Sequence, residues 1–226
     1  MTDLTTIIPC NPAGDILDKL YSDRYRPRTR LGLSEIGHEC SRYLFYKSHG
    51  YAGAQPEGQT LRLFELGNVL ESHIIEDLES AGFKIDGRQS VIRFESGTHK
   101  LEGHSDGIIT GPPPFSKPHL LEIKTAADKG FKDYKKNGYQ DWNPKYKGQI
   151  HAYMSGIGLS RCLCVVYNKN TSEIYSERIR IDREYADEIV KRAFWAMEQN
   201  NPPPRACPKA DYYFAKWCDY REECFK

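Results

Sequence analysis

The sequence predicts an α/β fold with a central mixed β-sheet flanked by helices. A helical stripe of apolar residues over 61–81 precedes several short strand-like segments between residues 84 and 125. A further helix begins near Pro144, two strands over 161–168 and 173–181 follow, and a helix over 183–199 closes the series. Groups of strands separated by helices are typical of sheets that carry helices on their faces.

Composition fits a domain of this kind. The 226 residues are 39% hydrophobic and 28% charged, which suits one soluble domain. A net charge of +1 gives no overall basic character, so any nucleic-acid contact would need a local basic surface. We find no apolar run long enough for a membrane span and no leader, and therefore expect a cytoplasmic protein with no membrane contact. Seven cysteines, an odd number, favour metal ligation of some over a disulfide framework.

We expect an irregular N-terminal arm over 1–30, a core over 31–200, and a tail over 201–226 that belongs to the same domain. The arm holds one short amphipathic piece at 16–21 and then alternating arginines. This basic run would suit either a phosphate backbone or solvent. Ser34 is a plausible N-cap for the next helix, which we expect to start within 33–37 and to include Cys40.

The stretch from Gly103 to Lys124 carries the strongest chemical pattern. Asp106 falls in an expected strand over 100–110, and a proline-rich break separates it from a second strand over 120–125. Glu122 and Lys124 are two apart and leave one face of that strand together, whereas Ile123 points into the core. The carboxylates of Asp106 and Glu122 and the ammonium of Lys124 would then meet at one place. Such a group suits a site that binds Mg²⁺ or Mn²⁺ and activates a water molecule. Alternatively, Glu122 and Lys124 form a surface pair on an edge strand.

These residues resemble the active-site motif of the PD-(D/E)XK nuclease superfamily. Asp106 matches the D of this motif, and Glu122-Ile123-Lys124 matches its ExK. The local sequence from Gly103 to Gly107 is similar to that of the RecB-like, phage exonuclease-type branch. The other such triplet, Asp133-Tyr134-Lys135, lies in a polar helical run. The resemblance implies a restriction-endonuclease-like core.

The resemblance also assigns roles to residues outside the motif. Further elements occur in family order, namely Gly67 with Glu71 on the helix over 61–81, and Gln149 with Tyr153 one turn apart after Pro144. It implies that the metal is held by Glu71, Asp106, Glu122 and the carbonyl of Ile123, with His104 as a further candidate. Lys124 would orient the attacking water, supported by Gln149 and Tyr153.

A cysteine tail resembles that of family members with an iron–sulfur cluster. Their pattern is Cys-x2-Cys-x5-Cys; Cys218 and Cys224 match its second half, but Ala215 stands where the first cysteine should be. Cys207 would replace it and join Cys40 in holding a [4Fe–4S] cluster, which would pack the tail against the N-terminal helix. The site could instead hold Zn²⁺, or the cluster could be lost.

The resemblance implies a metal-dependent DNA nuclease, in particular an exonuclease in phage or prophage DNA recombination, replication or repair. It would act in the cytoplasm of a bacterial host, with DNA and a recombination or replication protein as partners. The candidate DNA contacts are Arg42, Lys129, Lys132, Lys135 and Lys136. The alternative is a catalytically weak DNA-binding or recruitment module that keeps only the cysteine-bound metal.

Overall fold

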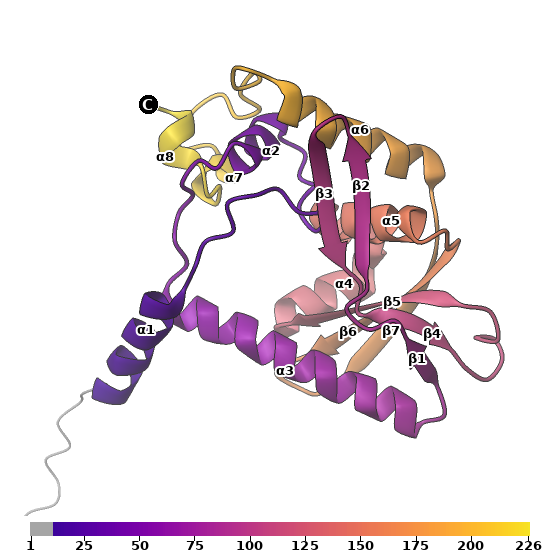
Figure 1. Cartoon of the computed structure of the whole chain (residues 1–226). Coiled ribbons are helices and arrows are strands. Elements are labelled where there is room, and N and C mark those ends of the chain that lie inside the picture. The colour runs from indigo at the N-terminus through magenta and orange to yellow at the C-terminus, as the bar shows by residue number, and fades with distance from the viewer. Residues whose placement is uncertain (1–10) are drawn as a thin grey trace, which may run out of the picture.

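The computed structural model describes residues 11–226, and its main element is a five-stranded mixed sheet in the order β1-β4-β5-β6-β7 (Figure 1). β5 and β6 are parallel neighbours, and the other pairs are antiparallel. The carboxyl ends of β5 and β6 therefore lie at the same edge. The five strands are β1 (Lys84–Asp86), β4 (Gly107–Thr110), β5 (His119–Ala126), β6 (Arg161–Asn168) and β7 (Ile174–Arg180).

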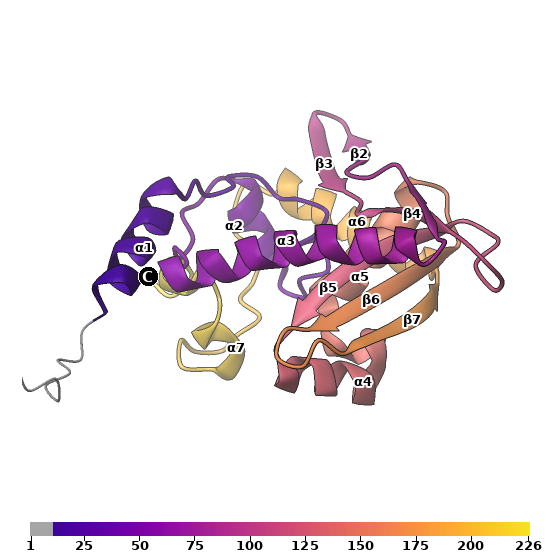
Figure 2. The ribbon, with the colours of Figure 1, turned by 90° about the horizontal axis from the view of Figure 1, so that it is seen from below.

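Helices cover both faces of this sheet, as the sequence predicts. One face packs through Ile123 and Val165 against α3 (Gly58–Ser80), which lies across the strands (Figure 2). The other face packs through Leu120 and Val166 against the remaining core helices. These are α2 (Ser41–Ser48), α4 (Asp128–Trp142), α5 (Pro144–Gly156) and α6 (Arg183–Glu198).

The predicted strand over 100–110 is in fact two strands that belong to different sheets. β3 (His99–His104) pairs with β2 (Val91–Ser96) in a separate hairpin, while β4 joins the main sheet. Asp106 thus lies in the short link where the chain leaves one sheet for the other. His104 ends β3, so it does not share a strand with Asp106. The first of the predicted strand-like segments, which begins at residue 84, is likewise divided into two strands, β1 and β2.

The expected helix start at Ser34 was also wrong. Residues 33–37 form turns, and α2 begins only at Ser41, with Cys40 as its N-cap. The reason is tertiary: the backbone N–H of Leu33 donates to the carbonyl of Glu102 on β3, which holds this segment beside the hairpin. Leu33 is fully buried there.

The arm is more regular than predicted. α1 (Pro12–Arg24) exceeds the short piece expected at 16–21, and residues 1–10 lie outside the described part. None of its residues is buried, and it touches α3 through an Arg62–Asp18 ion pair. Gly58 of α3 lies so close to the backbone of Asp18 that a Cβ there would meet it at 2.2 Å.

The C-terminal tail packs against α2, as predicted. The Tyr43 hydroxyl donates to the Asp219 carboxylate at 3.2 Å, and the rings of Tyr46 and Tyr220 lie 5.5 Å apart. The tail contains two single-turn helices, α7 (Tyr213–Lys216) and α8 (Arg221–Cys224). In residues 11–226, no helix is long and apolar enough to cross a bilayer.

Candidate active site

Asp106, Glu122 and Lys124 come together although they lie on separate segments. Asp106 Oδ2 accepts a 2.7 Å hydrogen bond from the backbone N–H of Ile123, so the link between β3 and β4 is fastened to the middle of β5. Lys124 Nζ lies 2.6 Å from Glu122 Oε1. The alternative of an exposed edge-strand pair does not fit, because β5 is a central strand and the Glu122 side chain is fully buried.

The electrostatics of this trio reflect burial of two acids beside one base. Burial raises the pKa of Asp106 well above its usual value, and the nearby Glu122 carboxylate adds to the rise. For Lys124, burial lowers the pKa, but the carboxylates of Glu122 and Asp106 outweigh burial and raise it above its ordinary value. The ammonium thus partly offsets the repulsion between two acids that burial has forced together.

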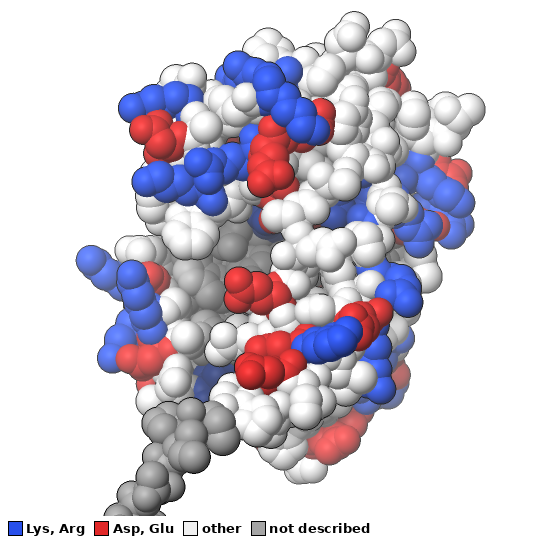
Figure 3. All heavy atoms as spheres, turned by 90° about the vertical axis from the view of Figure 1, so that its left-hand side faces the viewer, with Lys and Arg blue, Asp and Glu red and all other residues white. Residues whose placement is uncertain are grey.

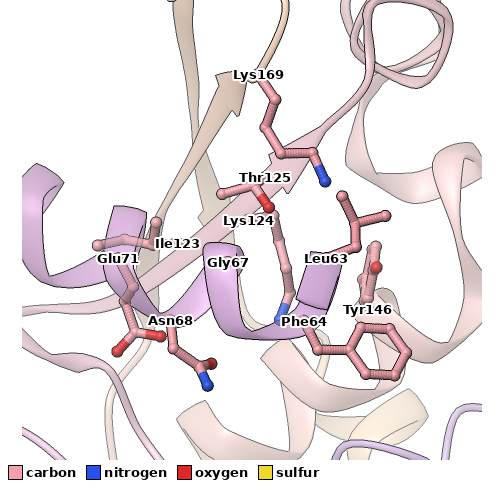
Figure 4. Close-up of a pocket in the computed structure, with 10 residues that line it drawn as sticks. All are labelled: Leu63, Phe64, Gly67, Asn68, Glu71, Ile123, Lys124, Thr125, Tyr146 and Lys169. Carbon is pink, nitrogen blue, oxygen red and sulfur yellow. The ribbon is translucent and has the colours of Figure 1, made fainter. Parts of the chain in front are cut away.

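Glu71 faces the same site from α3. Burial raises its pKa, and Glu122 adds to the rise, which indicates that the two carboxylates lie near each other. Glu71 Oε1 accepts a 3.3 Å hydrogen bond from the side chain of Gln89. Glu71 also lines a pocket of ≈ 410 Å³ together with Ile123 and Lys124 (Figure 4).

Gln149 and Tyr153 approach from α5. Lys124 Nζ donates to Gln149 Oε1 at 3.2 Å, so α5 supplies a second polar partner for the ammonium besides Glu122. Burial raises the pKa of Tyr153, whose hydroxyl lies so close to β3 that a Cβ on Gly103 would meet it at 2.5 Å. Gly103 therefore permits the hairpin to lie against α5 beside the site.

The trio and its neighbours offer oxygen ligands for a divalent cation. Glu122 Oε1 lies 2.6 Å from the Lys124 ammonium, and Glu122 Oε2 is buried with no hydrogen-bond partner among residues 11–226. Unsatisfied buried oxygens suit a hard cation such as Mg²⁺ or Mn²⁺. Across residues 11–226, however, no three His, Cys, Asp or Glu side chains already stand in an arrangement that would hold a metal ion. His104 is exposed at the end of β3 and does not line the pocket.

The predicted DNA contacts lie away from the pocket. Lys132 and Lys135 are exposed on α4 and form ion pairs of 2.6 Å with Asp128 and Glu173. Arg42 donates to Cys224 Sγ at 3.8 Å, which joins α2 to the tail. Lys129 and Lys136 are exposed on α4, and neither lines the pocket. DNA contact by these residues stays a prediction.

Two of the four candidate cysteine ligands, Cys207 and Cys218, lie near the other two, Cys40 and Cys224, although no three of these side chains already stand in an arrangement that would hold a metal ion. Burial raises the pKa of Cys207 and of Cys218, and in both thiols Cys40 and Cys224 add to the rise. All four are partly buried and free. By contrast, Cys162 and Cys164 are buried in β6 as packing residues. Ala215 stands where the resembling Cys-x2-Cys-x5-Cys pattern has its first cysteine, and its side chain is buried.

Sequence reasoning missed several residues that line the pocket, among them Phe64, Tyr146 and Lys169. Phe64 extends from α3, Tyr146 from α5, and Lys169 from the connection between β6 and β7 (Figure 4). Lys124 Nζ lies 4.8 Å from the centre of the Tyr146 ring. Lys169 directly follows β6, a strand parallel to β5, and ligands bind near the carboxyl ends of such strands; only the structure reveals this pairing.

Comparisons with known proteins support the fold. The sequence matches no protein-family model and no curated protein. An alkaline exonuclease from Laribacter hongkongensis (LHK-Exo), solved also in complex with dAMP, is similar in structure, with a TM-score of 0.54 and 16% identity over 79% of this chain and 90% of that one. The structure of SSO0001 is also similar, with a TM-score of 0.53 and 16% sequence identity. The match covers 94% of this chain and 95% of SSO0001. These likenesses confirm the predicted α/β fold class, which this chain shares with the alkaline exonuclease.

Proposed function

We propose that this chain is a metal-dependent DNA nuclease. The observation that carries the proposal is the fully buried Glu122 carboxylate, which has one oxygen without a hydrogen-bond partner in the described part of the chain and lies 2.6 Å from Lys124, a residue of the pocket wall. A buried carboxylate with an unsatisfied oxygen is costly for stability, which favours a functional reason for it. The shared fold with an alkaline exonuclease supports DNA as the substrate.

The residues of the site have different roles in the proposed hydrolysis. Asp106, Glu122, Glu71 and the Ile123 carbonyl would hold Mg²⁺ or Mn²⁺, which when bound polarises a phosphate and lowers the pKa of water. Lys124 orients the attacking water and stabilises the negative charge that develops on the phosphate. Gln149 keeps the Lys124 ammonium in place, since its side-chain oxygen accepts a hydrogen bond from it.

DNA attachment must be local. Figure 3 views the side of α1 and the tail, where Lys and Arg atoms gather in the upper part but acidic groups lie close by. A net charge of +1 gives the chain no overall basic character. We therefore propose that affinity comes from groups around the pocket, with Arg42 and the α4 lysines as outlying contacts. A role in phage or prophage recombination, replication or repair, with a protein partner in the bacterial cytoplasm, is part of the same proposal.

A cleavage assay tests this function. With Mn²⁺ or Mg²⁺, the purified protein is expected to degrade linear DNA, and EDTA should stop the reaction. Exonucleolytic action predicts mononucleotides or short oligonucleotides from end-labelled linear DNA and no cutting of closed circular DNA. Binding without any cleavage in Mn²⁺ would instead support a recruitment module.

We also propose a metal at Cys40, Cys207, Cys218 and Cys224, supported by the nearness of Cys207 and of Cys218 to both Cys40 and Cys224. Anaerobically purified protein is expected to contain about four iron atoms per chain if it holds a [4Fe–4S] cluster, or about one zinc ion in the zinc alternative. Cys218→Ser should lose the metal, whereas Cys162→Ala, in the sheet, should keep it. Protein free of both metals with all four thiols reactive would contradict this proposal.

A further inference from the structure

Lys169 occupies the end of the pocket away from the acidic residues. It immediately follows Asn168, the last residue of β6, and lines the pocket together with Lys124. Figure 4 shows its side chain reaching toward Thr125 and Leu63, whereas Glu71 and Asn68 lie at the opposite side. The pocket is therefore polarised, with the Glu71 carboxylate at one end and the Lys169 ammonium at the other.

The backbone around Lys169 is held rigidly. Its N–H donates to the carbonyl of Ala126 at the end of β5, at 2.9 Å. On one side, the fully buried Asn168 donates to Asp128 Oδ1 at 3.1 Å; on the other, Asn170 Oδ1 accepts from the N–H of Asp128 at 2.8 Å. Two asparagines thus fasten this turn to the start of α4, and the lysine between them is fixed beside β5.

Lys169 has no acidic partner among the described residues. On the neighbouring helix α4, Lys132 and Lys135 are each paired with a carboxylate at 2.6 Å, whereas Lys129 and Lys136 form no ion pair within residues 11–226 but are exposed to solvent. Lys169 forms no such pair, although burial lowers its pKa. A partly buried ammonium without a counter-charge is unfavourable on its own, and an anionic ligand in the pocket would offset that cost.

We infer that Lys169 binds a backbone phosphate of the DNA strand, adjacent to the phosphate held at Lys124. The inference rests on the proposed nuclease function and assigns the strand's path through the pocket. A volume of ≈ 410 Å³ lies in the range of small-ligand sites, so one nucleotide can enter. The apolar side chains of Leu63, Phe64 and Tyr146 line the same pocket and offer a surface for the sugar and base.

Binding of a single-stranded oligonucleotide at several salt concentrations tests this inference. In EDTA, Lys169→Ala is expected to weaken binding of the oligonucleotide about tenfold, because it removes one charge-assisted hydrogen bond to a phosphate. The slope of log affinity against log salt should fall by about 0.7, the value for one phosphate contact on a single strand. Lys169→Arg should keep the slope, because it keeps the charge. Lys191→Ala, an exposed lysine of α6 that does not line the pocket, is the control.

Kinetics separate this inference from the nuclease proposal. If the wild type cleaves DNA, Lys169→Ala should raise KM about tenfold with little change in kcat. A wild type that cleaves DNA, together with an unchanged slope and KM in Lys169→Ala, would overturn the role of Lys169 alone. A wild type that binds DNA with a Lys169-dependent slope but never cleaves it would overturn only the nuclease proposal. Absence of DNA binding by the wild type would overturn both.

Discussion

Asp106→Asn is expected to abolish DNA cleavage while leaving metal-free protein at least as stable as the wild type. The asparagine oxygen can still accept the hydrogen bond from Ile123 N–H, so the link to β5 survives. The substitution removes one of two buried carboxylates that repel each other, but it also removes a candidate metal ligand. We expect activity to fall by about 10³-fold or more, the upper end for losing one preorganised charge-stabilising group.

Lys124→Ala is expected to give the same loss of activity with the opposite effect on stability. Without the ammonium, Glu122 and Asp106 remain buried with no cation beside them, at a cost of about 3–5 kcal/mol in the free energy of unfolding. Urea unfolding in EDTA and cleavage in Mn²⁺ measure the two effects. Asp133→Asn, the exposed acid of the other triplet, is the matched control and should change neither. Cleavage at wild-type rate by both site variants would refute the assigned site.

The sequence predicted the parts of the site that follow from local periodicity. Glu122 and Lys124 share a face because strand side chains alternate, and Gln149 and Tyr153 share a face because they are four apart on a helix. The buried position of Ile123 follows from the same alternation. Short-range rules suffice wherever one element alone decides where a side chain points.

The errors arose where two segments meet. Asp106 reads as a strand residue, yet it lies where the chain passes from the β2–β3 hairpin to the main sheet. The turns at 33–37 read as a helix start, yet a backbone bond to Glu102 keeps them from becoming one. Lys169 reads as one polar residue of a turn, and only the parallel pairing of β5 and β6 brings it to the pocket. Pairing between distant strands is not encoded in local pattern, which is why these features required the structure.

Gly148→Ala is expected to destabilise the protein by about 3 kcal/mol, the upper part of the usual range for overpacking. Gly148 on α5 lies directly against Gly37, and a Cβ at Gly148 would meet Gly37 Cα at 2.4 Å and its N atom at 2.7 Å. The contact is reciprocal, since a Cβ on Gly37 would meet the Pro144 carbonyl oxygen at 2.2 Å. These atoms are backbone and cannot rotate away, so the helix or the turn must shift.

A shift of α5 caused by Gly148→Ala should also reduce DNA cleavage. Gln149 is the next residue on this helix, and its side-chain oxygen accepts the hydrogen bond from Lys124. Gly130→Ala is the matched control: it too lies inside a helix, but its Cβ would find only Ala126 Cβ at 3.7 Å. Gly130→Ala should therefore be neutral or stabilising by up to about 1 kcal/mol, the helix-propensity gain of alanine over glycine. Urea midpoints of the two variants give the comparison. Equal midpoints would mean that α5 and the 33–37 turns do not touch as closely as described, and that Gln149 is not positioned by this contact.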